Sequence, residues 1–209
     1  MARPSNTAER RAQITAALVQ VMAKRGYDGA SIADVAKAAR LTPGLVHYHF
    51  KNKQEILLGV LSELAERHLA GLDARLLAAG QDPRAQLVAF IDFHLGLGAD
   101  ADPERLACWI LLSGEALRDA KVRVRFEKAL EAIALRLTAL IRRGVAEQVF
   151  SCTSVEAAAS GLVATIQGYF VLAASARSLI PKGSAALTTK QMAEGLLRPL
   201  PPSPKRGRQ

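Results

Sequence analysis

The chain has 209 residues, half of them hydrophobic, and a formal net charge of +9. This length is enough for one large domain or two small ones, and the abundance of Ala and Leu favours a helical globular protein over a disordered one. The two cysteines, Cys108 and Cys152, are far apart in sequence, which argues against a disulfide framework or a zinc site. The first residues contain no apolar segment typical of a secretory signal, so we expect a cytoplasmic protein.

The positive charge is concentrated at the two ends of the chain. Residues 1–53 carry nine Lys or Arg and three Asp or Glu, whereas residues 54–197 carry fifteen and sixteen. Residues 198–209 carry four basic residues and no acidic one. A basic N-terminal module on a nearly neutral body suggests a polyanionic partner, although a well-solvated surface gives the same count.

The first expected helix covers residues 7–24, because Ile14, Leu18 and Val21 recur at helical spacing. Arg10 and Arg11 lie near its start, where the helix dipole does not favour cations. This placement suits a nearby anion.

Two short helices joined by a tight turn follow. Ser31 with Asp34 forms a pattern close to a capping box and predicts a helix that ends near residue 40. Thr42 then acts as an N-cap and Pro43 takes the first helical position, so a second helix starts there. This spacing predicts a helix-turn-helix, in which the second helix enters the major groove of DNA.

The rest of the chain shows helical patterns and no strand alternation. We expect helices over 53–79, 84–97, a segment that contains Trp109 and is capped by Asp102, a long segment that ends near 148, the charge-free segment 157–176, and 188–197. The charge-free segment has the length of a membrane span, but no Lys/Arg cluster brackets it, so we expect a helix buried in protein and no membrane partner. The Pro-rich basic tail 198–209 is expected to be disordered.

The sequence "LTPGLVHYHFKNK" at 41–53 contains three consecutive rings, His47, Tyr48 and His49. On a helix, residues two apart point in different directions, so the two histidines cannot share a metal ion, and we expect no metal site. No nucleophile motif, phosphate-binding loop or dinucleotide fingerprint occurs, so we expect neither an enzyme nor a cofactor.

The same stretch has the pattern of a DNA-reading helix. If Val46 and Phe50 point to the core, then Gly44 and Tyr48 face away from it. Polar rings, a small residue and nearby lysines suit contacts to bases and phosphates. The expected DNA-binding residues are Ser31, Thr42, Pro43, Gly44, Leu45, His47, Tyr48, His49, Lys51 and Lys53.

Residues 9–60 resemble the N-terminal domain of TetR-type transcriptional regulators, most clearly in "GASIADVAKAARLTPGLVHYHFKNKQEIL". The resemblance implies base contacts from Pro43, Gly44, Leu45 and His47. It also implies backbone contacts from four other residues: Ser31, Tyr48, His49 and Lys53. The family commonly has Tyr where this chain has His47, so this residue reads the site differently or makes its contact depend on pH.

The resemblance implies an all-α protein with a three-helix DNA-binding domain at 1–53 and a helical effector-binding and dimerisation domain at 54–197. The stretches "ACWILLSGEAL", "LIRRG" and "IQGYFVLA" are faintly similar to the BetI-like branch of the family. A homodimer would pack segments 122–146 and 155–177 into a four-helix interface, with close approach at Gly161, Ala164, Thr165 and Gly168 and with Leu172 beyond them. The dimer would bind a palindromic operator on double-stranded DNA as a repressor.

A small-molecule effector in the body would then lower the affinity for DNA. Candidate pocket residues are Phe90, Phe93, His94, Trp109, Glu115, Tyr169 and Phe170, although each ring alone suits plain core packing better. One alternative is a helical small-molecule-binding protein or enzyme with an incidental basic N-terminus. Another is an activator or a nucleoid-type DNA binder without an effector.

Overall fold

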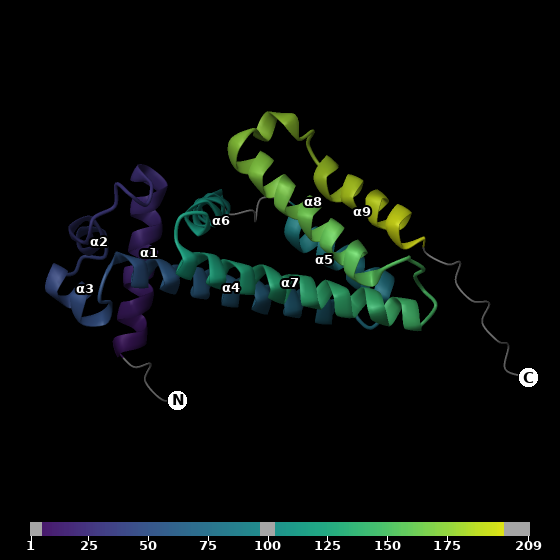
Figure 1. Ribbon diagram of the computed structural model, residues 1–209, viewed down its shortest axis with the longest axis horizontal. Coiled ribbons are helices and arrows are strands. Elements are labelled where there is room, and N and C mark those ends of the chain that lie inside the picture. Colours follow the sequence, from purple (N-terminus) through teal and green to yellow (C-terminus); the bar gives the residue numbers. More distant parts are fainter. Residues whose placement is uncertain (1–5, 97–102, 199–209) are drawn as a thin grey trace, which may run out of the picture. The chain divides into compact units, whose positions relative to one another are not determined.

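The computed structural model describes residues 6–96 and 103–198, and within these ranges the chain is helical without a strand (Figure 1). The helices are α1 Asn6–Arg25, α2 Ile32–Ala38, α3 Pro43–His49, α4 Lys53–Ala78, α5 Pro83–Leu95, α6 Pro103–Ala116, α7 Ala120–Ala146, α8 Val155–Ser175, the 3-10 turn η1 Arg177–Leu179 and α9 Ser184–Leu197. The expected all-α fold is confirmed. The last helix starts four residues earlier than the sequence pattern predicted. The expected cap Asp102 and residues 199–209 of the tail lie outside the described residues.

The chain forms two compact units, each with its own core. The first unit combines residues 1–68 with 102–130, so it contains α1 to α3, most of α4, α6 and the start of α7. The second unit combines residues 69–101 with 131–209 and contains the end of α4, α5, most of α7, α8 and α9. These two units are defined by packing. The expected boundary at residue 53 between a DNA-binding domain and an effector-binding domain is a division by function, and it stays a prediction.

The core of the first unit is built from the apolar faces of its helices. Ile14 and Leu18 of α1 are fully buried, as are Ile56 and Leu61 of α4. They pack in one cluster with Leu112 of α6. Val35 of α2 and Val46 of α3 are buried in the same cluster. This packing holds the two short helices in place, because helices of seven residues are not stable alone.

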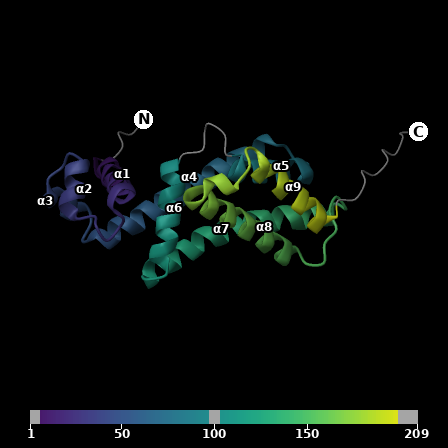
Figure 2. The same ribbon diagram turned by 90° about the horizontal axis from the view of Figure 1, so that it is seen from above.

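In the second unit, α8 and α9 lie side by side (Figures 1 and 2), and α9 also packs on α5. The turn between α7 and α8 is closed by Phe150, whose buried ring lies against the backbone of Gly144. The amide of Ser151 donates to the carbonyl of Leu197, 2.7 Å away, and so joins this turn to the end of α9.

Candidate nucleic-acid interface

The helix α3 has one buried face and one exposed face. Val46 and Phe50 are 0% and 1% exposed, whereas Tyr48 is 79% exposed. Gly44 and His47 are also exposed, and Leu45 and His49 are half-buried. The outward face is therefore the one that the helical spacing predicted.

Local capping explains why α3 begins at residue 43. The Thr42 hydroxyl accepts a hydrogen bond from the Leu45 amide at 3.2 Å, and Pro43 occupies the first turn. Both Thr42 and Pro43 are exposed. The N-terminus of α3 is thus fixed by residues that lie beside its exposed face.

The expected capping box at the start of α2 is present. The Ser31 hydroxyl accepts from the Asp34 amide at 3.1 Å, and the Ser31 amide donates to the Asp34 carboxylate at 3.1 Å. Hydrogen bonds from Ser31 and the nearby guanidinium of Arg25 hold the pKa of the Asp34 carboxyl below its usual value. Ser31 remains exposed, and its hydroxyl also donates to the Asp34 carboxylate at 2.6 Å, so its contact with a phosphate stays a prediction.

Arg11 of α1 holds the C-terminal end of α3. Its guanidinium donates to the carbonyl of His49 and lies 3.9 Å from the centroid of the Phe50 ring. The ring of His49 in turn meets the ring of Tyr48 edge-on, with centroids 5.0 Å apart. Our list of expected site residues omitted Arg11; its signal in the sequence was a cation at the unfavourable end of a helix.

Lys53 has a different environment from the one we expected. Its ammonium donates to the carbonyls of Tyr27 at 2.8 Å and Ala30 at 2.9 Å, and it lies 4.3 Å from the centroid of the Tyr27 ring. These contacts engage the ammonium within the protein, and its expected contact with a phosphate stays a prediction. Lys51 is exposed, and its backbone amide donates to Glu55.

The candidate effector residues divide between the two units. Phe90 and His94 are buried in the second unit, with ring centroids 4.5 Å apart. The rings of Phe93 and Phe170 lie 5.2 and 6.5 Å from that of His94, and Tyr169 packs against the same core. The structure therefore brings five of the seven residues into one core: Phe90, Phe93, His94, Tyr169 and Phe170.

Trp109 and Glu115 belong to the first unit. The ring of Trp109 stacks near that of Phe126, with centroids 4.6 Å apart. Burial raises the pKa of the Tyr27 hydroxyl to about 12, and the negative charge of Glu115 adds to this effect. These two residues therefore lie apart from the aromatic core around His94, in the first unit.

The first unit also has an open cavity of about 580 Å³ along α1 and α4. Arg11, Thr15, Phe50 and Glu63 contribute to its lining, and none of the seven candidate effector residues does. Across residues 6–96 and 103–198, no three His, Cys, Asp or Glu side chains are grouped in a way that could hold a metal ion.

Among the described helices, α8 is long and apolar enough by composition to cross a membrane, and 22% of its most apolar window is buried. Such a helix is weak evidence for a membrane protein, because core helices of other proteins have the same composition.

Comparison with known proteins gives matches over both parts of the chain. Residues 14–60 match the family model "Bacterial regulatory proteins, tetR family", and residues 83–198 match "BetI-type transcriptional repressor, C-terminal". The regulator BetI of Rhizobium meliloti is 26% identical over 163 residues, which are 78% of this chain and 76% of that protein. The regulator TtgR of Pseudomonas putida is 40% identical over 60 residues, 29% of each chain.

Solved structures agree with these matches. A transcriptional regulator from Rhodococcus sp. Rha1 has a TM-score of 0.78 at 26% identity and covers 91% of this chain and 99% of its own. A regulator from Saccharomonospora viridis, solved with choline, has a TM-score of 0.76 at 23% identity. The match covers 90% of this chain and 95% of that protein. The family matches span more than half of the chain, and the exposed face of α3 is the surface that the resemblance assigned to DNA. The protein therefore belongs to the TetR family of bacterial transcriptional regulators, with a BetI-type C-terminal domain, and is a DNA-binding repressor.

Proposed function

We propose that this repressor is a cytoplasmic homodimer that binds a palindromic operator and leaves it when a small molecule binds the second unit. In this proposal, the α3 helices of two protomers bind half-sites in adjacent major grooves. Contacts to bases come from Pro43, Gly44, Leu45 and His47. Contacts to phosphates come from Ser31, Tyr48, His49 and Lys51, with Thr42 fixing the start of the helix.

The observation that supports a dimer most directly is the uncovered face of α8. Gly161, Ala164, Gly168 and Val171 are exposed, lie three or four residues apart and carry no charge. Apolar surface of this kind is costly to leave in water, and small residues let two helices approach closely. A second copy of the chain would cover it.

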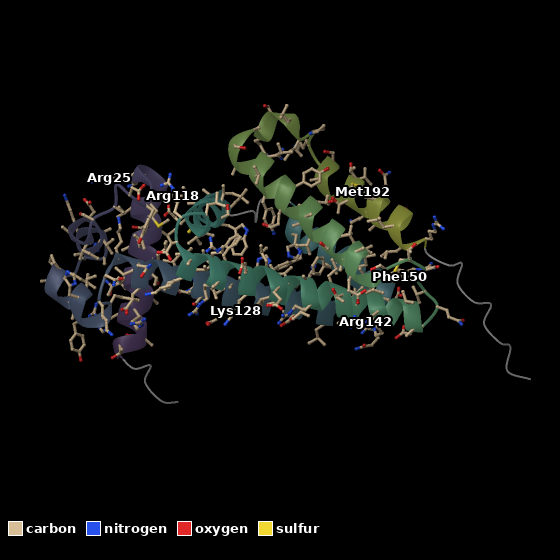
Figure 3. All side chains as sticks on the ribbon, in the orientation of Figure 1. Arg25, Arg118, Lys128, Arg142, Phe150 and Met192 are labelled. Carbon is tan, nitrogen blue, oxygen red and sulfur yellow. The ribbon has the colours of Figure 1, made fainter. Side chains whose placement is uncertain are left out.

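The helix beside α8 in this interface is α9 rather than α7 in our proposal. Leu187, Met192 and Leu196 of α9 are 58%, 44% and 45% exposed. The exposed part of α7 in the same unit carries Glu131 and Arg142, which is labelled in Figure 3. Arg142 is paired with Glu156 at 2.7 Å. We therefore replace the expected segment 122–146 by α9, and keep α8 with Thr165 and Leu172.

An arginine in the centre of the exposed stripe tests the dimer. A Cβ on Gly168 meets no atom within 4 Å, so Gly168→Arg is compatible with the folded protomer. We expect a monomer by light scattering and much weaker binding to the operator. Leu77→Arg is the matched control, because Leu77 is 76% exposed on α4. A dimeric Gly168→Arg protein would contradict this interface.

The effector site is supported by the aromatic core around His94. The Nδ1 atom of His94 lies 2.8 Å from the Phe90 carbonyl oxygen, and three phenyl rings surround the imidazole. A cluster of this kind suits an apolar or cationic ligand, because aromatic faces attract cations.

Thermal-shift screening against metabolites, choline included, tests the effector. A ligand that binds the folded state raises the melting temperature, and the same compound should release the DNA. His94→Ala should remove the shift while DNA binding without ligand persists. A repressor that no metabolite releases would favour a DNA binder without an effector.

A further inference from the structure

Arg40 has a backbone conformation that favours glycine. Its φ angle is +54°, in the left-handed region, where a side chain with a Cβ is strained. The Arg40 amide donates to the Lys37 carbonyl at 3.1 Å, and the Leu41 amide donates to the Ala36 carbonyl at 2.9 Å. This pair of bonds ends α2 in a Schellman motif, with Arg40 at the position that glycine most often occupies.

Elsewhere the chain has glycine after a helix in the same conformation. Gly26 follows α1 with a φ of +70°, and Gly80 follows α4 with a φ of +78°. Among the described residues, the non-glycine exceptions beside Arg40 are Gln148 and Arg198. An arginine in this backbone conformation lowers the stability of the fold, so its side chain is expected to have a role that compensates for the strain.

The guanidinium of Arg40 is available for a partner. The side chain is exposed, and within residues 6–96 and 103–198 it makes no hydrogen bond or ion pair. By contrast, Arg11 binds His49, and Arg25 pairs with Asp34 at 3.0 Å.

The place of Arg40 in the first unit suggests what that partner is. It lies in the turn between α2 and α3, two residues before Thr42, the N-cap of the helix that carries the exposed face. Lys37, in the last turn of α2, is also exposed. Positive side chains beside a helix that enters the major groove meet the sugar–phosphate backbone along its edge.

We propose that Arg40 binds a DNA phosphate beside the recognition helix, and that this contact compensates the strain of its backbone. The proposal rests on the DNA binding described above and adds a residue to it. The same charge also interacts favourably with the helix dipole, because it lies at the C-terminus of α2. DNA binding measurements separate the two roles.

The test compares four variants: Arg40→Gly, Arg40→Gln, Arg40→Lys and Gln148→Gly. Gln148 is a matched control in the second unit, because it has a φ of +59° and the same pattern of bonds: its amide donates to the Val145 carbonyl, and the Val149 amide donates to the Gly144 carbonyl. The probes are a duplex that the wild-type protein selects from random-sequence DNA and a scrambled duplex of equal length. Fluorescence anisotropy over a range of salt concentrations gives the affinity and the salt slope, and circular dichroism gives the melting temperature.

We expect Arg40→Gly to melt at or above the wild-type temperature and yet to bind the selected duplex about tenfold more weakly. The plot of log K against log salt should become shallower by about 0.9 for each bound protomer. The loss should be similar on the scrambled duplex, since phosphate contacts do not depend on sequence. Arg40→Gln should show the same losses of affinity and of salt slope as Arg40→Gly. Arg40→Lys should keep the salt slope of the wild type, and Gln148→Gly should bind DNA as the wild type does.

Unchanged affinity and salt slope in Arg40→Gly and Arg40→Gln would overturn the proposal. They would limit the role of the Arg40 charge to its interaction with the dipole of α2. A loss confined to the selected duplex would overturn the phosphate assignment, because it indicates a base contact. An equal loss in Gln148→Gly would also overturn it, because it points to a general effect of glycine. Failure of the wild-type protein to select any duplex would instead contradict the DNA-binding function itself.

Discussion

Arg11 and Phe50 are 39 positions apart in the sequence, yet the guanidinium of Arg11 lies 3.9 Å from the centroid of the Phe50 ring. The same guanidinium donates to the carbonyl of His49, the last residue of α3. One side chain of α1 thus holds both the end of the recognition helix and the aromatic residue that anchors it in the core. This contact therefore adds to the burial of Val46 and Phe50 in positioning the exposed face of α3.

We expect Arg11→Ala to destabilise the protein by about 1 kcal/mol, which is typical of a cation–π contact at an exposed site. DNA affinity should fall as well, because α3 loses the contact that orients it. Chemical denaturation and anisotropy measure the two effects. Arg11→Lys should restore part of the stability, and a variant Arg11→Ala with wild-type stability and affinity would contradict this role.

Tyr48 should affect DNA binding without affecting the fold, because its side chain is 79% exposed. Tyr48→Phe removes only the hydroxyl, and we expect a loss of about 1–2 kcal/mol in binding free energy if that group donates to a phosphate. Tyr48→Ala should lose more, since it also removes the contact surface of the ring. The melting temperature of both variants should remain that of the wild type. If Tyr48→Ala kept the wild-type affinity for DNA, the predicted contact between the exposed face of α3 and DNA would be wrong.

Gly144 is required by the ring of Phe150. A Cβ at residue 144 would lie 2.2 Å from the Phe150 ring, so Gly144→Ala forces the buried ring to move. Such overpacking costs about 1–3 kcal/mol of unfolding free energy, and a urea titration measures it. Gly114→Ala is the control, because a Cβ there meets no atom within 4 Å and alanine favours the helix. The double variant Gly144→Ala with Phe150→Leu should recover part of the loss, because the smaller leucine side chain leaves room for the added Cβ.

His68 should make stability depend on pH. Burial lowers the pKa of its imidazole from 6.5 to about 4, so the unfolded chain takes up a proton on His68 at a higher pH than the folded chain does. The associated stability is therefore complete above pH 6.5 and is lost as the pH falls towards 4, by up to about 3 kcal/mol. Unfolding free energies of the wild type and His68→Gln between pH 4 and 7.5 check this, and the variant should show the flatter profile. Parallel profiles would show that His68 is not the group responsible.

The sequence alone was sufficient for the α-helices, apart from the start of α9, and for the outward face of α3. Capping by Ser31 with Asp34 and by Thr42 with Pro43 is local, and so is the spacing of Val46 and Phe50 that leaves Tyr48 outside. These features depend on residues within one turn of each other, so their pattern can be read directly from the chain.

Only the tertiary structure decided which distant residues meet. Lys53 has the charge and position of a phosphate contact in the sequence, but its ammonium is held by carbonyls more than 20 residues earlier. Arg11 reaches the end of α3 from α1, and Trp109 lies in a different unit from the aromatic core around His94. Contacts of this kind follow from how helices pack, and packing depends on the shapes of whole faces rather than on the spacing of residues along one helix.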